Sequence, residues 1–141
     1  MGNIERLDLE KITSQDHNSL EIISKLGENN LCPVETWILD RSKDCGFNCK
    51  DAEDIKWAAI EFVTNAIKHG NEMDSSKKVR LHTTKYQNVF YVAVEDEGKG
   101  FDLEYYRISA GRPGLNVSWA TTDDFYNFGD NVVYLAKTLK E

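Results

Sequence analysis

The sequence predicts an α+β two-layer sandwich, in which a mostly antiparallel sheet carries helices on one face. Three observations support this prediction. One early strand is followed by two helical patterns between residues 33 and 71. Two pairs of short apolar strands come later, and each pair is joined by a short turn, as in antiparallel hairpins. At 141 residues, with 40% hydrophobic and 29% charged residues, the chain is expected to form a single domain with its own core.

The first elements follow a polar N-terminal extension, residues 1–17, which contains one weak strand candidate around Ile12. Residues 19–26 alternate between apolar and polar side chains and predict a strand that ends at the polar turn GENN. Pro33 then opens the helix PVETWILDRSKD. Proline suits an early helical position because its missing N–H has no helical partner there.

A second helix begins at Lys50 or Asp51 and has the strongest helical pattern in the chain. Its apolar residues recur at three- and four-residue spacing, namely Ile55, Ala58, Ala59, Phe62, Val63, Ala66 and Ile67. Gly70 and Asn71 are expected to end this helix, since both tolerate a left-handed backbone.

The second half of the chain combines strands, glycine loops and short helices. In order, we expect strands at 79–84 and 89–95 joined across KYQN, the loop EDEGKGFD, a helix at 103–108, the loop AGRPG, a helix at 115–121, and a hairpin of 125–128 and 132–139 that turns at Gly129 and Asp130.

Charge and composition exclude several classes of function. A net charge of -7 is unsuited to a duplex nucleic-acid surface, which needs clustered Lys and Arg. No apolar run approaches the ~20 residues of a membrane span, and the charged N-terminus lacks the apolar core of a signal peptide. Cys32, Cys45 and Cys49 lack the common paired spacing of zinc sites, so we expect reduced thiols in a cytoplasmic protein.

The stretch EFVTNAIKHG, residues 61–70, ends the second helix with several polar side chains. Glu61, Asn65 and His69 are four residues apart, which predicts one common helix face, and Lys68 borders that face. The apolar stripe occupies the opposite side. This polar face is either an ordinary solvent-facing surface or a binding site, and the poor helix former Asn slightly favours a site.

A second polar stretch, VEDEGKGFD, leaves the end of the predicted strand 89–95. Asp96, Gly98 and Gly100 are residue types that form simple turns. They also suit a binding loop, because a carboxylate at a strand end can accept hydrogen bonds and glycine lets a ligand approach the backbone. By itself this motif is weak evidence for either interpretation.

Together, EFVTNAIKHG and VEDEGKGFD resemble the Bergerat fold of the histidine-kinase-like (GHKL) ATPases, which include gyrase, heat-shock chaperones, histidine kinases and mismatch-repair ATPases. The resemblance spans roughly residues 19–139. The two stretches look most like the anti-sigma factor serine/threonine kinases of bacterial partner-switching systems. In those proteins a similar helix and a similar loop occur on a chain of about this size, and the pair is more specific than either motif alone.

The resemblance implies roles for the polar residues of the helix. Asn65 would give a carbonyl oxygen to Mg²⁺, whose other ligands are phosphate oxygens and water. Glu61 would act as general base on an attacking hydroxyl. Lys68 and His69 would lie near the phosphates of ATP. For His69, an ordinary half-buried histidine with satisfied hydrogen bonds is an equally good explanation.

The resemblance also assigns the two glycine loops to the nucleotide. Asp96 would accept a hydrogen bond from the exocyclic amine of adenine, and Gly98 and Gly100 would let the nucleotide lie close to the backbone. In the second loop, Arg112, Gly114 and Leu115 would contact it too.

The second loop departs from the family pattern. Arg112 stands where family members usually carry glycine, Pro113 follows it, and the lid at residues 103–110 is short. These departures concern ATP turnover more than the fold.

Two functions follow as hypotheses. The first is an ATP- and Mg²⁺-dependent anti-sigma factor that phosphorylates a serine or threonine of an antagonist protein, with a sigma factor as its other partner and a homodimer as its possible form. The second is a non-catalytic module of the same fold, which sequesters a partner. The catalytic piece of a histidine kinase is less favoured, because the 60 residues before Glu61 encode the domain's own strand and helix.

Overall fold

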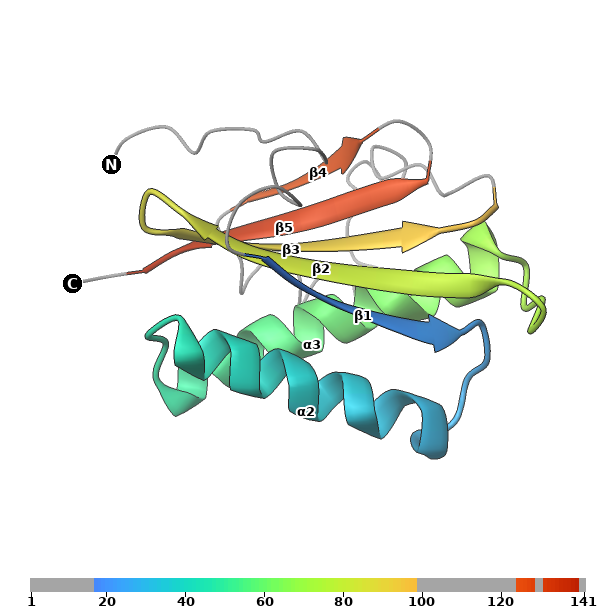
Figure 1. Ribbon diagram of the computed structural model, residues 1–141, viewed down its shortest axis with the longest axis horizontal. Coiled ribbons are helices and arrows are strands. Elements are labelled where there is room, and N and C mark those ends of the chain that lie inside the picture. The colour runs from blue at the N-terminus through green and yellow to red at the C-terminus, as the bar shows by residue number, and fades with distance from the viewer. Residues whose placement is uncertain (1–16, 99–123, 129–130, 140–141) are drawn as a thin grey trace, which may run out of the picture.

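The computed structural model describes residues 17–98, 124–128 and 131–139, which form two layers (Figure 1). One layer is an antiparallel sheet of five strands, and the other is a pair of helices on one of its faces. The described elements are, in order, β1 (His17–Ile23), α2 (Glu28–Asp44), α3 (Cys49–Asn65), the π-helical turn η1 (Ala66–Gly70), β2 (Lys78–Tyr86), β3 (Val89–Asp96), β4 (Asp124–Phe128) and β5 (Val132–Thr138). The predicted α+β sandwich is confirmed.

The strands lie in the order β1-β2-β3-β5-β4, so β3 is central. Every neighbouring pair is antiparallel, and the last pair of β2 and β3 joins Val79 to Asp96. The β2–β3 turn contains Gln87 and Asn88, with φ of 47° and 69°. Two successive positive φ values are typical of the type I′ turn that suits a two-residue hairpin. The predicted hairpin is therefore present, with each strand slightly longer than expected.

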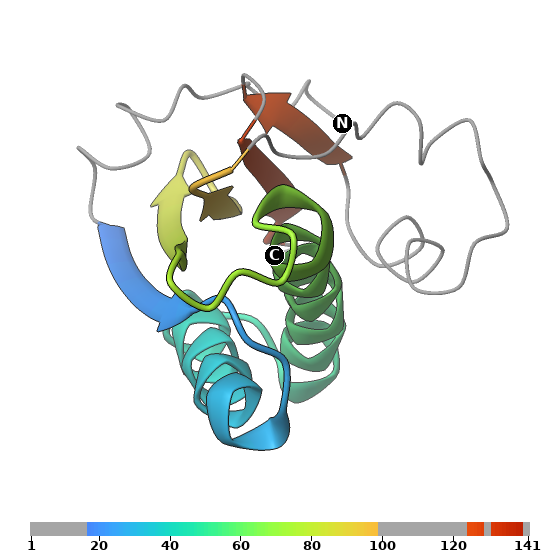
Figure 2. The same cartoon turned by 90° about the vertical axis from the view of Figure 1, so that its right-hand side faces the viewer.

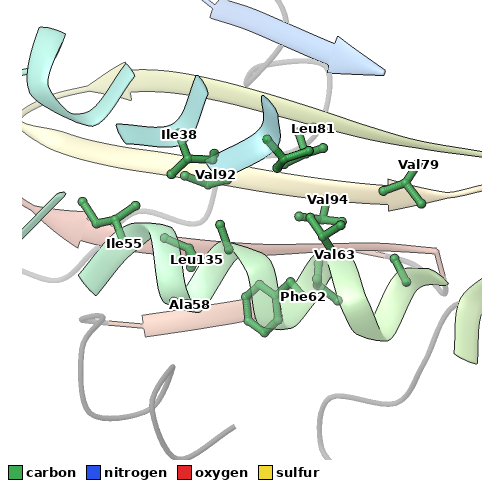
Figure 3. Close-up of a cluster of buried hydrophobic side chains, with 14 of the residues drawn as sticks. Ile38, Ile55, Ala58, Phe62, Val63, Val79, Leu81, Val92, Val94 and Leu135 are labelled. Atoms are coloured by element: carbon green, nitrogen blue, oxygen red, sulfur yellow. The ribbon is translucent and has the colours of Figure 1, made fainter. Parts of the chain in front are cut away.

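The main core lies between the sheet and the two helices (Figure 2). All residues of the apolar stripe predicted for the second helix are buried. Figure 3 shows how side chains from both layers meet, among them Ile38, Ile55, Ala58, Phe62, Val63, Val79, Leu81, Val92, Val94 and Leu135.

The central strand β3 is buried on both faces. Alternation places Phe90, Val92 and Val94 in the core beneath the helices. Tyr91 belongs to a second buried cluster on the other face, where its ring meets that of Tyr134 at a centroid distance of 5.8 Å. The run VFYVAV is apolar without a break, as is usual in a strand that is covered on both sides. We did not predict this second cluster.

Leu81 allows a direct test of the main core. Its side chain is fully buried beneath the helices, so Leu81→Ala should lower the free energy of unfolding by about 2–5 kcal/mol. The exposed Lys85 on the same strand is a control, and Lys85→Ala should stay within about 0.5 kcal/mol of wild type. Urea unfolding followed by circular dichroism measures both. A small loss for Leu81→Ala would contradict its position in the core.

The first helix begins earlier than predicted. The sequence indicated a start at Pro33, whereas α2 starts at Glu28 and takes the last three residues of the GENN segment into its first turn. Gly27, with φ of 127°, precedes the helix, and its carbonyl accepts from the N–H groups of Asn30 and Leu31. Pro33 therefore lies inside the helix and leaves the carbonyl of Asn29 without a helical donor. Asn29 is exposed, so water can take that place.

Several predictions lie outside the described residues: the strand candidate around Ile12, the helices at 103–108 and 115–121, the loop AGRPG, and the turn at Gly129 and Asp130. The three cysteines form no disulfide, as expected. Within the described part of the chain, no helix has both the length and the apolar character needed to cross a membrane.

Candidate functional site

The helix α3 is fixed at its start by a cap and along its length by its buried stripe. The Asn48 side chain accepts a 2.8 Å hydrogen bond from the Asp51 N–H, one of the donors that a helix start leaves unpaired. With the apolar stripe turned to the sheet, Glu61 and Asn65 are left half-buried at the edge of the layer. Lys68, in the following turn, is exposed.

Glu61 is an acid in a partly desolvated position. Burial raises the pKa of its carboxyl group above the ordinary value, and the nearby positive charge of Lys68 opposes part of that rise. A carboxylate that ionises less readily is a stronger base once it is ionised. Perturbed acids of this kind also occur at purely structural positions, so the pKa supports a site here only together with the geometry.

The end of the helix differs from the prediction. Gly70 and Asn71 do not take a left-handed backbone; the positive φ values belong instead to Glu72 and Met73, at 53° and 62°. The turn Ala66–Gly70 is a π-helix, in which the N–H of Asn71 bonds to the carbonyl of Ala66 at 2.8 Å. Such wide turns are rare and are often found at functional sites.

The wider turn also changes how the polar side chains are arranged. It inserts one extra residue, so a spacing of four no longer places His69 directly above Asn65. Lys68 and His69 are both exposed in this turn. The face that the sequence predicted as one row is therefore regular from Glu61 to Asn65 and altered beyond it.

Gly70 is required by what lies next to it. Alternation along β3 turns Asp96 to the helix side, like Phe90, Val92 and Val94. Asp96 is 3% exposed, and a Cβ built on Gly70 would overlap its Oδ2 atom. A Cβ built on Gly98 would likewise overlap the carbonyl oxygen of Gly70. Only glycine at both positions permits this close approach.

Several hydrogen bonds hold the backbone around Asp96. Its N–H donates to the carbonyl of Asn131 at 2.9 Å, and its carbonyl accepts from the Asn131 side chain at 3.1 Å. Its own Oδ1 accepts from the N–H of Gly98 at 2.8 Å, which is the short-range bond of an Asx turn. The end of β3 lies beside the end of the helix (Figure 1), and the Asp96 carboxylate is held there against Gly70.

The close approach of Gly70 to Asp96 places two segments that carry predicted residues next to each other. Glu61, Asn65 and Lys68 come from the helix end, and Asp96 and Gly98 from the strand end. Gly100, Arg112, Gly114 and Leu115 lie outside the described residues.

The sequence indicated no role for the contact of Gly70 with Asp96 or for the side chain of Asn71. A glycine that directly follows polar helix residues signalled a helix end, and nothing in the pattern distinguished that from close packing.

The polar groups of the site suit a phosphorylated ligand that carries a nucleobase at one end. Lys68 offers a charged donor, Asn65 a carboxamide oxygen, and Asp96 an acceptor carboxylate. The described residues contain no cluster of three or more His, Cys, Asp or Glu that could hold a metal. An ion at Asn65 would take its other ligands from phosphate oxygens of the bound molecule and from water.

A match to a family model decides the wider classification. Residues 30–112, more than half of the chain, match the model of the histidine kinase-like ATPase domain. The chain belongs to this family. The match includes both the α3–η1 segment and the end of β3, and the resemblance inferred from the two motifs is thereby confirmed.

The curated relatives include bacterial proteins named as serine-protein kinases and as an anti-sigma factor. The chain is 30% identical over 66 residues to the serine-protein kinase RsbW of Oceanobacillus iheyensis, a match covering 47% of this chain and 42% of the relative. The RsbW of Listeria monocytogenes is 34% identical over 59 residues, covering 42% and 38%. The anti-sigma F factor of Bacillus subtilis is 38% identical over 82 residues, covering 56% of each. The aligned part is thus about half of each relative or less.

Among solved structures, the histidine kinase domain of the blue-light activated kinase from Erythrobacter litoralis EL346 is similar. Its TM-score is 0.54 at 18% sequence identity, and the match covers 77% of this chain and 59% of that domain. This likeness supports the histidine kinase-like ATPase fold.

Proposed function

We propose that this protein is an ATP-binding anti-sigma factor that phosphorylates a serine or threonine of an anti-sigma factor antagonist. The observation that carries the proposal is the contact between Gly70 and Asp96. It joins the helix end, which carries Lys68 and Asn65, to the buried carboxylate of Asp96, which can accept a hydrogen bond from a nucleobase. The names of the relatives, serine-protein kinase and anti-sigma F factor, support the same function.

The residues present fit Mg²⁺ as the accompanying ion. Asn65 is half-buried and offers a neutral oxygen, and phosphate oxygens with water complete the all-oxygen set that Mg²⁺ prefers. Once bound, the ion would neutralise charge on the phosphates. Lys68 would add a charged donor on the same side.

The reaction uses Glu61 as the proton acceptor. The hydroxyl of the antagonist loses its proton to the Glu61 carboxylate while its oxygen bonds to the γ-phosphorus of ATP. The bond from that phosphorus to the β–γ bridging oxygen breaks, and ADP leaves with the electron pair. The chain contributes mainly positioning, together with a base of raised pKa.

Partner exchange would follow from the same chemistry. The unphosphorylated antagonist and the sigma factor compete for the protein, and phosphorylation of the antagonist releases it in favour of the sigma factor. We place this exchange in the cytoplasm, where transcription is regulated.

Label transfer tests the proposal directly. The purified protein is incubated with γ-labelled MgATP and a candidate antagonist from the same organism, beside a Glu61→Ala variant. We expect label on the antagonist with wild type, and a loss of roughly 100-fold or more in the variant. Nucleotide binding without any transfer would reject the kinase and favour the non-catalytic module.

A further inference from the structure

The side chain of Asn71 lies between two strands at the edge of the proposed nucleotide site. It is fully buried, and both ends of its carboxamide are used. Nδ2 donates to the carbonyl of Lys78 at 2.9 Å, and Oδ1 accepts from the N–H of Glu97 at 2.8 Å. Lys78 begins β2, and Glu97 directly follows β3.

The side chain of Asn71 takes the place of one pair of backbone hydrogen-bonding groups in the β2–β3 ladder. The antiparallel pairing of β2 and β3 stops at Val79 and Asp96, so the next pair would be Lys78 and Glu97. The carboxamide of Asn71 instead takes one backbone group from each, much as a peptide group of a third strand would. The Glu97 side chain completes the closed network by accepting from the Lys78 N–H at 2.5 Å.

The consequence is a fixed position for Glu97, the first residue after β3. The ladder ends at Val79 and Asp96, and Glu97 is bonded to Asn71, the residue that follows η1, while the N–H of Gly98 bonds to Asp96. The backbone of Asn71 is itself anchored by its bond to Ala66 and by the N–H of Asp74 at 3.0 Å. Because Asp96 directly precedes Glu97, its position is set by Asn71 at the helix end as well as by the sheet.

The identity of the residue matters to this role. Asn71 has φ of -94°, so its backbone gives no reason for asparagine. Aspartate has no donor for the Lys78 carbonyl, and alanine can make neither bond. A carboxamide is the short side chain that offers one donor and one acceptor in the required places.

We propose that Asn71 is a positioning residue for base recognition: through Glu97 it holds Asp96 and Gly98 in the arrangement that distinguishes adenine. This inference rests on the proposed function, in which Asp96 accepts from the exocyclic amine. It assigns Asn71 no contact with the nucleotide. Its effect should therefore appear in the choice of base more than in the binding of phosphates.

A comparison of ATP with ITP measures that choice, because ITP carries a carbonyl where adenine has the amine. Calorimetric affinities are determined for wild type, Asn71→Ala and Asn71→Asp. We expect Asn71→Ala to weaken ATP by about 10-fold or more and ITP by much less, so that the preference for ATP falls at least about 5-fold. Asn71→Asp, which keeps the acceptor for Glu97, should retain more of the preference.

Thr83→Val is the matched control. Thr83 is also fully buried on β2 and accepts a 3.2 Å bond from Arg41, far along the strand from the site. Its loss should lower the melting temperature without changing the ratio of ATP to ITP affinity. Hydrogen exchange adds a readout without nucleotide: the Glu97 amide should exchange faster in Asn71→Ala and stay protected in Thr83→Val.

The outcomes separate the two proposals. A wild type that binds neither ATP nor ITP would overturn the proposed function, and the role of Asn71 with it. If wild type prefers ATP and the folded Asn71 variants keep the same preference, only the role of Asn71 is overturned. If Asn71→Ala does not fold, Asn71→Asp decides: it loses the bond to the Lys78 carbonyl, so a preference below that of wild type supports the role of Asn71 and an unchanged preference overturns it.

Discussion

Glu61→Gln should lower the phosphoryl-transfer rate roughly 100- to 10,000-fold, while nucleotide affinity stays near the wild-type value. Glutamine has nearly the same size and fills the same half-buried position, but it cannot accept the hydroxyl proton. The rate is measured from label on the antagonist under single-turnover conditions, and ATP affinity is measured by calorimetry. A variant that transfers phosphate at the wild-type rate would exclude Glu61 as the base.

The pH dependence of the same reaction carries a second signature of Glu61. The base must be ionised, so the rate falls as pH drops through the pKa of the Glu61 carboxyl. Burial raises that pKa above the ordinary value for a glutamate, so the acidic limb should be shifted to higher pH. Lys68→Gln removes the charge that opposes the rise, so the limb should move to higher pH. Glu53→Gln, at an exposed position on the same helix, should leave the limb and the rate unchanged.

As pH falls, the contribution of Glu61 to stability should rise while the reaction rate falls. Because the folded-state pKa of Glu61 is raised, the stability linked to its protonated form is fully present below the unfolded-state pKa. That stability is lost as pH rises through the folded-state pKa. At neutral pH the wild type lacks it, whereas the uncharged Gln side chain keeps it. Glu61→Gln should therefore melt at or above the wild-type temperature at pH 7, which distinguishes lost chemistry from lost folding.

The elements that the sequence predicted well are those with a strong periodic signal. The second helix and the β2–β3 hairpin were recognisable because their buried faces repeat at the helical and strand periods. The start of α2 was missed, since Gly27 and the polar residues after it suggest a turn as readily as a helix start. Pro33 then drew the predicted boundary five residues too late.

Within the site, local pattern identified residue types but could not reveal contacts over long sequence distances. Asp96 and Gly70 are far apart in the chain, and their contact depends on the alternation of β3 and on the π-turn of η1. Nothing in the sequence EFVTNAIKHG distinguishes a π-turn from an ordinary helix end. The reason for Asn71 likewise became visible only when Lys78 and Glu97 were seen on either side of it.

Gly70→Ala should weaken ATP binding by at least about 100-fold, which is about 2.7 kcal/mol. The added methyl group would stand 2.5 Å from Cγ of Asp96 and overlap its Oδ2 atom, so the carboxylate must leave its position at the end of β3. Gly27→Ala is the control, because it strains a backbone with φ of 127° and has no atom within 4 Å of the new group. It should lower stability and leave ATP affinity unchanged, as calorimetry and thermal melting can show.

A double variant separates the collision from the loss of recognition. The folded state of Gly70→Ala should be destabilised by about 1–3 kcal/mol, the usual cost of overpacking. In an Asp96→Ala background the same change should cost less, since only the Cβ of residue 96 remains, 3.0 Å from the new methyl group. ATP affinity should stay low in the double variant, because the acceptor for the base is gone. Recovery of both stability and affinity would show that Asp96 does not recognise the base, whereas recovery of stability alone ties recognition to the carboxylate that Gly70 accommodates.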